Sequence, residues 1–377
     1  MTRSAPVKVN GLTDVTDVVS GAIATVALKN DGTVWAWGWN ARGDLGNGRA
    51  SIKEVQYTPV QIIGLTDVIA IGENGKSSFY AIKEDGTLWS WGCQAKNVWG
   101  DSGNCPFSAS PRLPSQISEF SDVINFQSGG GTIAGESINS NYVLESNGTI
   151  WSWGSNFVGQ LGDGTNSDTI LPHGITGSDR DTPEQVAGLT GVKEIAVVVA
   201  PGVKVFALKK DGTVWGWGDN DLGRLGTGMT ITTVDKPTQV SELTGIIKIS
   251  ADTFNTLALR NDGTVWAWGS YNLYGAIGVG AGTSTVTPVQ LVELHDIVDI
   301  KTNGLASYAL KGDGTIWGWG SGPLKTGGGA EAKYLTPIQI CNLPGITNIV
   351  FGIDFVPHLI RNDGTVWKAY FDGCTQL

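Results

Sequence analysis

Apolar residues of this chain fall in short stretches, separated by polar turns rich in glycine, aspartate and asparagine. No long stretch has the period of an amphipathic helix. Near the N-terminus the pattern predicts strands over residues 15–20, 24–30, 33–38 and 59–62. The Asp-Gly step at 31–32 predicts a tight hairpin turn, because glycine accepts a positive φ and aspartate bonds its own backbone. The pattern therefore predicts an all-β protein of short antiparallel strands.

The same pattern repeats along the whole chain. The segment KNDGTVWAWGWN at 29–40 has six further copies, the last of them degenerate. The turn glycines of the seven copies are Gly32, Gly86, Gly148, Gly212, Gly263, Gly314 and Gly364. They lie 50 to 64 positions apart, a period typical of stacked supersecondary units rather than of separate domains. Four antiparallel strands per copy predict the blade of a β-propeller.

A fourth strand follows the third in six copies. These strands begin at Pro59, Pro114, Pro183, Pro237, Pro288 and Pro337, and a proline suits an edge strand. The last copy stops after its third strand, whereas PVKV at 6–9 precedes the first copy. We therefore predict a seven-bladed β-propeller of four-stranded antiparallel blades, with the ring closed by the N-terminal strand joining the last blade. The expected blades of this single domain (1–377) span 15–62, 68–117, 123–186, 192–240, 246–291, 297–340, and 346–370 plus 5–9.

Charge and composition exclude several classes of partner. The net charge is -10, from 25 Lys and Arg against 35 Asp and Glu. Because such a surface repels phosphate backbones and anionic lipid, we expect neither nucleic acid nor a membrane as partner. No apolar run approaches the ~18 residues of a membrane span. The segment MTRSAPVKVN lacks the apolar stretch of a signal peptide, so a cytoplasmic protein and a secreted one with its signal removed both remain open.

The repeat resembles that of a known family. Residues 27–48, ALKNDGTVWAWGWNARGDLGNG, and their copies are similar to the repeat of the regulator of chromosome condensation family, DGxVxxWGxNxxGQLG. The resemblance covers essentially the whole chain and implies a seven-bladed propeller. The family commonly has a histidine four residues before the Leu of the second strand. Here those positions hold Ala24, Ser78, Ser140, Lys204, Asn255, Ala306 and Val356, which favours a resemblance to Trp-rich bacterial members.

Six copies carry a Trp-x-Trp pair in the third strand, beginning with Trp35 and Trp37. Residues two apart on a strand point to the same face of the sheet. Since every copy needs to fill the space against its neighbour, we interpret the pairs as packing. The Gly-Trp-Arg-His-Thr motif of light-sensing family members is absent from the sequence. The other copies have no tryptophan at the position of Trp39, so we treat Trp39 separately from the Trp-x-Trp pairs.

The loops of the two faces differ. Asp-Gly turns and fourth-to-first turns share one face and are short, whereas first-to-second and third-to-fourth loops share the other face and vary in length. The longest of both kinds belong to the third copy, at 128–141 and 155–182. Because variable loops on a rigid scaffold usually carry recognition, we predict partner binding on this variable loop face, centred on blades 2–4. The candidate partner-binding residues are Trp39, Trp99, Phe107, Phe157, His173, Phe254, Tyr271, Tyr274 and Phe355.

Catalysis and metal binding have little support in the sequence. The three histidines lie in different copies, and only His173, with Asp179 and Asp181, could form a local acid–base group. No nucleophile motif accompanies it, and neither a CxxC zinc spacing nor a phosphate-binding glycine loop is present. We therefore expect no enzyme activity, no catalytic residue, no metal and no cofactor.

The four cysteines give two expectations. Cys93 and Cys105 fall in the same third-to-fourth loop, so a disulfide between them is feasible. Cys341 ends a fourth strand on the short-turn face, whereas Cys374 follows a third strand on the variable loop face. These two are expected to lie too far apart to pair.

The sequence thus favours a non-enzymatic, monomeric propeller that binds a protein partner through its variable loops. The family resemblance also implies one alternative, guanine nucleotide exchange on a small GTPase. Exposed Trp and Tyr side chains, which can stack on sugar rings, leave a carbohydrate-binding propeller as a second alternative.

Overall fold

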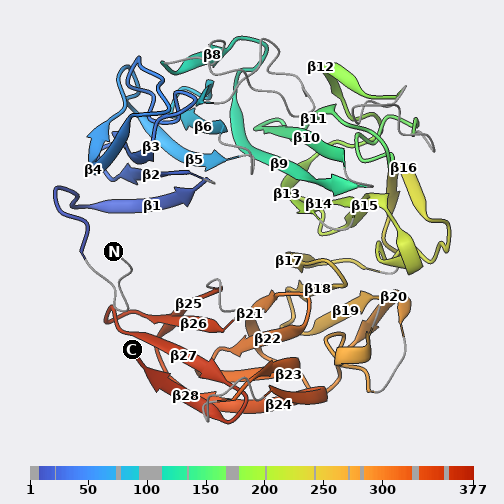
Figure 1. Ribbon diagram of the computed structural model, residues 1–377. Helices are drawn as coiled ribbons and strands as arrows, with labels where there is room; N and C mark the ends of the chain where they lie inside the picture. The colour runs from blue at the N-terminus through green and yellow to red at the C-terminus, as the bar shows by residue number, and fades with distance from the viewer. Residues whose placement is uncertain are drawn as a thin grey trace. The chain divides into compact units, whose positions relative to one another are not determined.

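The computed structural model describes residues 8–21, 23–73, 78–92, 113–133, 136–166, 178–199, 202–241, 243–270, 272–280, 284–324, 331–351 and 356–377. Within these ranges, 28 strands form seven four-stranded antiparallel sheets, and the helices are two single-turn 3₁₀ segments. In every sheet the four strands lie in chain order (Figure 1). The predicted all-β fold of four-stranded antiparallel blades is therefore confirmed, and the sheets are numbered here as blades 1 to 7 along the chain.

The chain divides into two compact units. The first comprises residues 1–157 and 167–190 and holds blades 1 to 3. Blade 1 contains β1 (Val15–Ser20), β2 (Ala24–Lys29), β3 (Val34–Trp39) and β4 (Val55–Gln61). Blade 2 contains β5 (Val68–Glu73), β6 (Ser78–Lys83), β7 (Leu88–Gly92) and β8 (Ser115–Ile117). Blade 3 contains β9 (Val123–Ile133), β10 (Glu136–Glu145), β11 (Ile150–Gly154) and β12 (Arg180–Gln185).

The second unit comprises residues 158–166 and 191–377 and holds blades 4 to 7. Blade 4 contains β13 (Val192–Val199), β14 (Val203–Lys209), β15 (Val214–Asp219) and β16 (Thr233–Gln239). Blade 5 contains β17 (Ile246–Ala251), β18 (Asn255–Arg260), β19 (Val265–Gly269) and β20 (Thr285–Gln290). Blade 6 contains β21 (Ile297–Thr302), β22 (Ala306–Lys311), β23 (Thr315–Pro323) and β24 (Glu331–Asn342). Blade 7 contains β25 (Ile346–Phe351), β26 (Pro357–Arg361), β27 (Val366–Tyr370) and β28 (Gly373–Gln376).

The fourth strand of blade 1 is longer than the sequence predicted, because it begins at Val55 rather than at Pro59. A bulge explains the difference. Ala36 of β3 pairs with Val60 and Gly38 with Gln56, so several residues of β4 oppose a single residue of β3. Pro59 falls within this bulge, where its missing N–H leaves no ladder bond unmade.

The Asp-Gly hairpin turns form as predicted. The Asp31 carboxylate accepts hydrogen bonds from Thr33 N at 3.1 Å and from Thr33 Oγ1 at 2.6 Å. Gly32 has a φ of 74°, in the left-handed region that favours glycine. The Thr33 hydroxyl, followed by Lys29 and the Thr33 amide, lowers the pKa of Asp31 to about 2.

In five of the six pairs the two tryptophans have different environments, whereas Trp35 and Trp37 of the first pair are both half-buried. Five second tryptophans, Trp91, Trp153, Trp217, Trp268 and Trp319, are fully buried. The Trp319 indole N–H donates to Ala276 O at 2.9 Å, which joins blade 6 to the loop after β19 of blade 5. First tryptophans such as Trp35 are only half-buried, and the Trp35 indole donates to its neighbour Thr33. The second position of the pair therefore supplies the core between adjacent blades.

The fourth strand of blade 7 corrects a prediction. Residues 5–9 were expected there, but the structure places β28 beside β27, with Ala369 paired with Cys374 and Tyr370 with Gly373. Residues 1–7 lie outside the described ranges, and Lys8 and Val9 form no strand. The physical reason is local: the turn after Tyr370 lets the chain pair with its own preceding strand, and such short loops cost little closure entropy.

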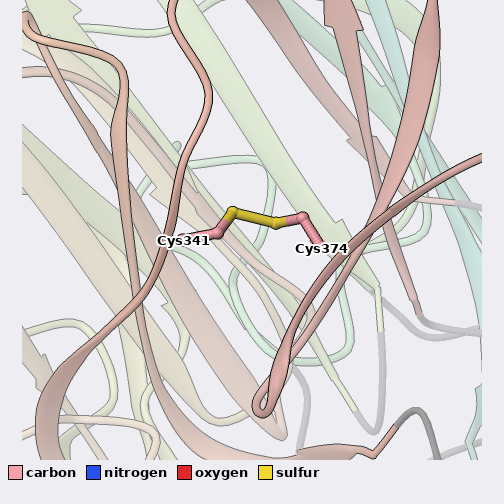
Figure 2. The surroundings of a disulfide bond; sticks show 2 residues. All are labelled: Cys341 and Cys374. Carbon is pink, nitrogen blue, oxygen red and sulfur yellow. A yellow bond between two sulfur atoms is a disulfide. The ribbon is translucent and has the colours of Figure 1, made fainter.

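The same hairpin explains why the prediction for Cys341 and Cys374 was wrong. The two residues form a disulfide with their Cα atoms 6.0 Å apart (Figure 2). Cys374 was expected beyond the end of the third strand, but β28 runs back along β27 and carries it toward Cys341 near the end of β24. Cys93 and Cys105 lie outside the described residues, so their disulfide stays a prediction.

Candidate functional site

The third-to-fourth loop of blade 1, residues 40–54, is organised by one side chain. The side-chain amide nitrogen of Asn40, Nδ2, donates to Asn47 Oδ1 at 3.1 Å, to Arg49 O at 3.1 Å and to Glu54 Oε2 at 3.0 Å. The side-chain oxygen of Asn40, Oδ1, accepts from Leu45 N at 3.1 Å, and Leu45 is fully buried. These bonds satisfy the loop backbone internally and hold it in one shape.

Trp39 lies at the base of this loop and remains 39% exposed. Its partner across the β3–β4 ladder is Val55. The indole N–H donates to Ile52 O at 2.8 Å, so the polar edge of the ring is bound while part of the apolar ring faces solvent. Ile52, whose carbonyl accepts this bond, and Tyr57, two residues beyond Val55 on β4, are also exposed, Tyr57 to 88%. Trp39 therefore stands in an exposed apolar cluster, as expected of a binding residue.

The other predicted partner-binding residues have varied positions. Phe157 follows β11 and is half-buried, Phe254 lies between β17 and β18 and is half-buried, and Tyr274 ends the 3₁₀ segment Asn272–Tyr274 and is 45% exposed. These residues and Trp39 belong to four different loops, so a single shared site stays a prediction. The remaining candidates, Trp99, Phe107, His173, Tyr271 and Phe355, lie outside the described residues.

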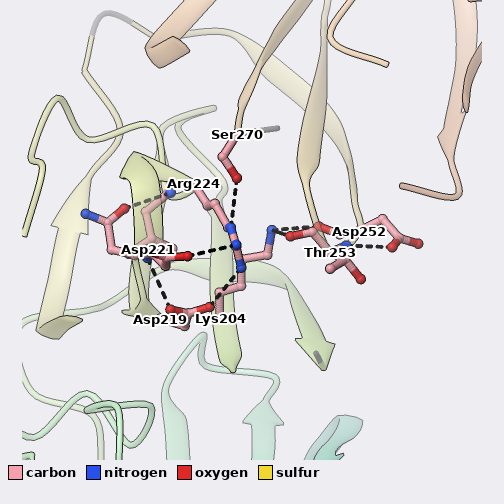
Figure 3. A network of polar contacts seen from close by, with 9 residues as sticks. Lys204, Asp219, Asp221, Arg224, Asp252, Thr253 and Ser270 are labelled. Carbon is pink, nitrogen blue, oxygen red and sulfur yellow. Dashed lines mark hydrogen bonds and ion pairs between the residues drawn. The ribbon is translucent and has the colours of Figure 1, made fainter. Parts of the chain in front are cut away.

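A buried polar network in blades 4 and 5 was not predicted from the sequence. Lys204, on β14, is fully buried and extends toward the turn between β17 and β18 (Figure 3). Its ammonium group donates to Asp252 O at 2.6 Å and to Thr253 O at 3.1 Å. The side chain thus links the second strand of one blade to a loop of the next, immediately before Phe254.

Arg224 forms the second half of this network. Its Nε donates to Ser270 Oγ at 2.8 Å, and its Nη atoms pair with Asp219 at 3.3 Å and with Asp221 at 3.0 Å (Figure 3). The guanidinium also lies 5.7 Å from the centre of the Phe254 ring. Lys204 therefore bonds the two carbonyls that precede Phe254, and Arg224 lies over the Phe254 ring.

Burial changes the protonation of these groups. Desolvation, followed by the positive charge of Arg224, lowers the pKa of Lys204 to about 7, although the carboxylates of Asp219 and Asp252 oppose the shift. Burial also raises the pKa of Asp219, against the Asp221 amide and Arg224. A lysine with such a pKa can act as a base or nucleophile. Here its nitrogen is enclosed and bonded to two carbonyls, which favours a structural role.

The sequence carried one signal for this network. Lys204 occupies the position where the family commonly has histidine, and it is the only ionisable residue among the seven equivalents. What the sequence did not indicate was its contact, because Asp252 and Thr253 lie 48 and 49 positions further along the chain.

We expect Lys204→Met to remove a pH dependence of stability. Because the folded pKa of about 7 lies below the model value of 10.5, the unfolded chain binds more protons between these pH values. The free energy of unfolding of the native chain should therefore rise with pH across that window. Urea unfolding at pH 7, 8.5 and 10 should show that the free energy of unfolding of the native chain, relative to that of Lys204→Met, grows with pH. Other titrating groups, such as the buried Tyr142 and Tyr308 with their raised pKa, are common to both proteins and cancel in this difference. Equal slopes for both would show that Lys204 does not titrate there.

Two other classes of site were searched. Within the described ranges, no group of three His, Cys, Asp or Glu side chains is placed to hold a metal ion. None of the helices in the described part of the chain is long and apolar enough to cross a membrane.

Comparison with known proteins gives consistent matches. The model of the RCC1-like domain matches residues 1–358. The human E3 ubiquitin-protein ligase HERC2 is 29% identical over 329 residues, which cover 85% of this chain but only 6% of the ligase. The ultraviolet-B receptor UVR8 of Arabidopsis thaliana is 25% identical over 357 residues, covering 91% of this chain and 74% of the receptor.

Solved structures show the same fold. Human WBSCR16 superposes with a TM-score of 0.62 at 19% identity, covering 90% of this chain and 85% of that one. Prp20p of Saccharomyces cerevisiae, studied for its binding to Gsp1p and histones, gives a TM-score of 0.59 at 21% identity and covers 86% and 76%. Seven four-stranded blades, a domain match over residues 1–358 and these likenesses agree. The chain belongs to the RCC1-like domain family.

Proposed function

We propose that this chain is a non-enzymatic propeller that binds a protein partner through its variable loop face, centred on blades 2–4. The observation that carries the proposal of protein binding is the set of exposed apolar residues around Trp39 in blade 1, next to a loop whose backbone is fixed by Asn40. An apolar surface held in one conformation loses little entropy on binding, and aromatic side chains contribute most of the energy of many interfaces.

The relatives support binding rather than catalysis. UVR8 is a receptor, and Prp20p binds Gsp1p and histones. HERC2 is a ligase, but this chain corresponds to only 6% of its length, so ligase activity is not proposed. The centre on blades 2–4 rests on loop length, and much of those loops lies outside the described residues.

Site-specific photo-crosslinking tests the face. A benzophenone amino acid at Ile52 or Tyr274 should crosslink a protein from the native cell extract. The same group at Ile69 or Val298, at the start of β5 and β21 beside the short turns, should not. Ile69 and Val298 are 58% and 56% exposed, which matches Ile52 at 56% and makes them controls for exposure. Stronger crosslinking from the control positions would place the interface on the other face.

Removal of residues 167–177 tests the centre of the interface. If blade 3 contributes, the deletion should abolish the crosslink from Ile52, which lies in the same compact unit, while leaving the protein folded by circular dichroism. The same preparation tests the two alternatives. Accelerated release of labelled nucleotide from a GTPase would indicate exchange activity, and retention on a glycan array would indicate carbohydrate binding.

A further inference from the structure

Loop 40–54 of blade 1 presents positive charge in a protein whose net charge is -10. Its two carboxylates are used internally: Asp44 is fully buried, and Glu54 accepts from the side-chain amides of Asn40 and Asn47. Arg49 and Lys53 are exposed. Neither pairs with a carboxylate in the described part of the chain. The loop therefore turns its negative groups inward and exposes the positive groups of Arg49 and Lys53.

Exposed apolar residues lie in this loop and on the strands that flank it, β3 and β4. Trp39, Ile52, Val55 and Tyr57 are 39%, 56%, 41% and 88% exposed. Lys53 lies between Ile52 and Val55 in the chain. The backbone of Arg49 is bound to the residue that follows Trp39, because the Arg49 carbonyl accepts from the Asn40 side-chain amide. We define this combination of Trp39, Arg49, Ile52, Lys53 and Tyr57 as the blade 1 patch.

The architecture of the blade does not require this combination. In blade 4, Asn220 takes the place of Asn40 and donates to Met229 O at 3.1 Å, just as Asn40 donates to Arg49 O. Met229 therefore replaces the arginine in an equivalent loop. Asp219 stands where Trp39 stands and is bound by Arg224. The same loop geometry forms in blade 4 without an arginine or a tryptophan. The loop geometry therefore does not require Arg49 or Trp39 in blade 1.

We propose that the blade 1 patch binds an acidic peptide segment of a partner protein, with an aromatic or aliphatic side chain among its carboxylates. Arg49 and Lys53 would receive the carboxylates, and the cluster around Trp39 and Tyr57 would receive the apolar side chain. This inference rests on the proposed function and names the chemistry of the partner.

The net charge of the protein sharpens the selectivity of this patch. An acidic segment is repelled by the predominantly acidic chain and attracted only where positive groups are exposed. At about 0.15 M salt the screening length is about 8 Å, so the nearest charges decide the interaction. Like-charge repulsion therefore disfavours binding of an acidic ligand wherever no positive group is exposed.

Fluorescence anisotropy at about 0.15 M salt tests the inference. The probe is a fluorescein-labelled twelve-residue peptide of alternating Asp, Glu and Ser with a central Phe. The charge reversal Arg49→Glu with Lys53→Glu should raise its Kd at least about tenfold. Tyr57→Ala should raise it about fivefold, as expected for one aromatic contact. Lys193→Glu with Lys210→Glu reverses the same number of charges at two exposed lysines of blade 4. It is the charge-matched control and should change Kd less than about twofold.

Several outcomes would overturn the inference. The inference is wrong if the acidic peptide does not bind measurably, or if its Kd is unchanged in the charge-reversed variant. It is also wrong if a peptide with Lys and Arg in place of Asp and Glu binds as tightly as the acidic peptide. Tighter binding of single-stranded DNA at the same residues would assign the patch to phosphate backbones instead. If crosslinking at Ile52 persists while the acidic peptide fails, the partner chemistry is wrong and the proposed function stands. If both fail, the blade 1 patch is not part of the interface.

Discussion

Replacement of Trp319 by alanine is expected to lower the free energy of unfolding by about 3–5 kcal/mol. The indole is fully buried in the core cluster between blades 5 and 6, together with Leu257, Leu291 and Ile300. Its N–H bonds Ala276 O, and a Cβ added to Gly278 would lie 2.8 Å from Trp319 Nε1, so the glycine and the ring fit closely. Removing the ring leaves a cavity that the packed side chains around it cannot fill. It also removes one of three donors to Ala276 O, which keeps its bonds from Asn255 Nδ2 and Ser307 Oγ. Urea unfolding followed by circular dichroism measures the change.

Trp317→Ala provides the matched control, since Trp317 lies two positions earlier on the same strand and is only half-buried. Less apolar area is removed from water when Trp317 folds into place than when Trp319 does. We therefore expect Trp317→Ala to lower the free energy of unfolding by only about 1–2 kcal/mol. Equal losses for the two variants would contradict the assignment of the second tryptophan to the core between blades.

Removal of the Cys341–Cys374 disulfide is expected to lower the free energy of unfolding by about 3–4 kcal/mol. The bond closes a loop with a sequence separation of 33 residues, which restricts the unfolded chain. It also ties β28 to blade 6, and β28 has only four residues with which to pair with β27. The double variant Cys341→Ser with Cys374→Ser should show the loss in urea unfolding and faster amide hydrogen exchange in β28.

Hydrogen exchange in blade 4 is the internal control for this variant, because its strands do not include either cysteine. Faster exchange confined to blades 6 and 7 would match a local tether. A loss below about 1 kcal/mol, with unchanged exchange in β28, would show that the hairpin with β27 alone holds the strand.

The local sequence pattern was sufficient to predict most strands and hairpin turns of this protein. The Asp-Gly turns and the Trp-x-Trp strands were predictable because their determinants lie within a few residues of one another, as with Asp31 and Thr33. The exposed position of Trp39 was also foreseeable, since it interrupts the repeat. The start of β4 was missed because a bulge depends on the pairing partner and leaves no mark in the strand itself.

The candidate site was predictable only in part. Aromatic residues at loop positions could be listed, but their separation into exposed and half-buried groups depends on neighbours distant in the chain. Phe254 shows this best, because its ring lies beneath Arg224, 30 positions away in the sequence. The inward carboxylates and outward basic groups of loop 40–54 likewise follow from the bonds that Asn40 makes, and the sequence shows only the residues.

The sequence by itself determined the number of blades, the order of strands and the role of the repeated tryptophans. These follow from a period and from short-range chemistry that recur in every copy. Only the tertiary structure decided that β28 completes blade 7, that Cys341 meets Cys374 and that Lys204 reaches the turn at Asp252 and Thr253. Each of these is a single contact between segments distant in sequence or between unequal copies, and a repeating pattern carries no information about which such contacts the folded chain makes.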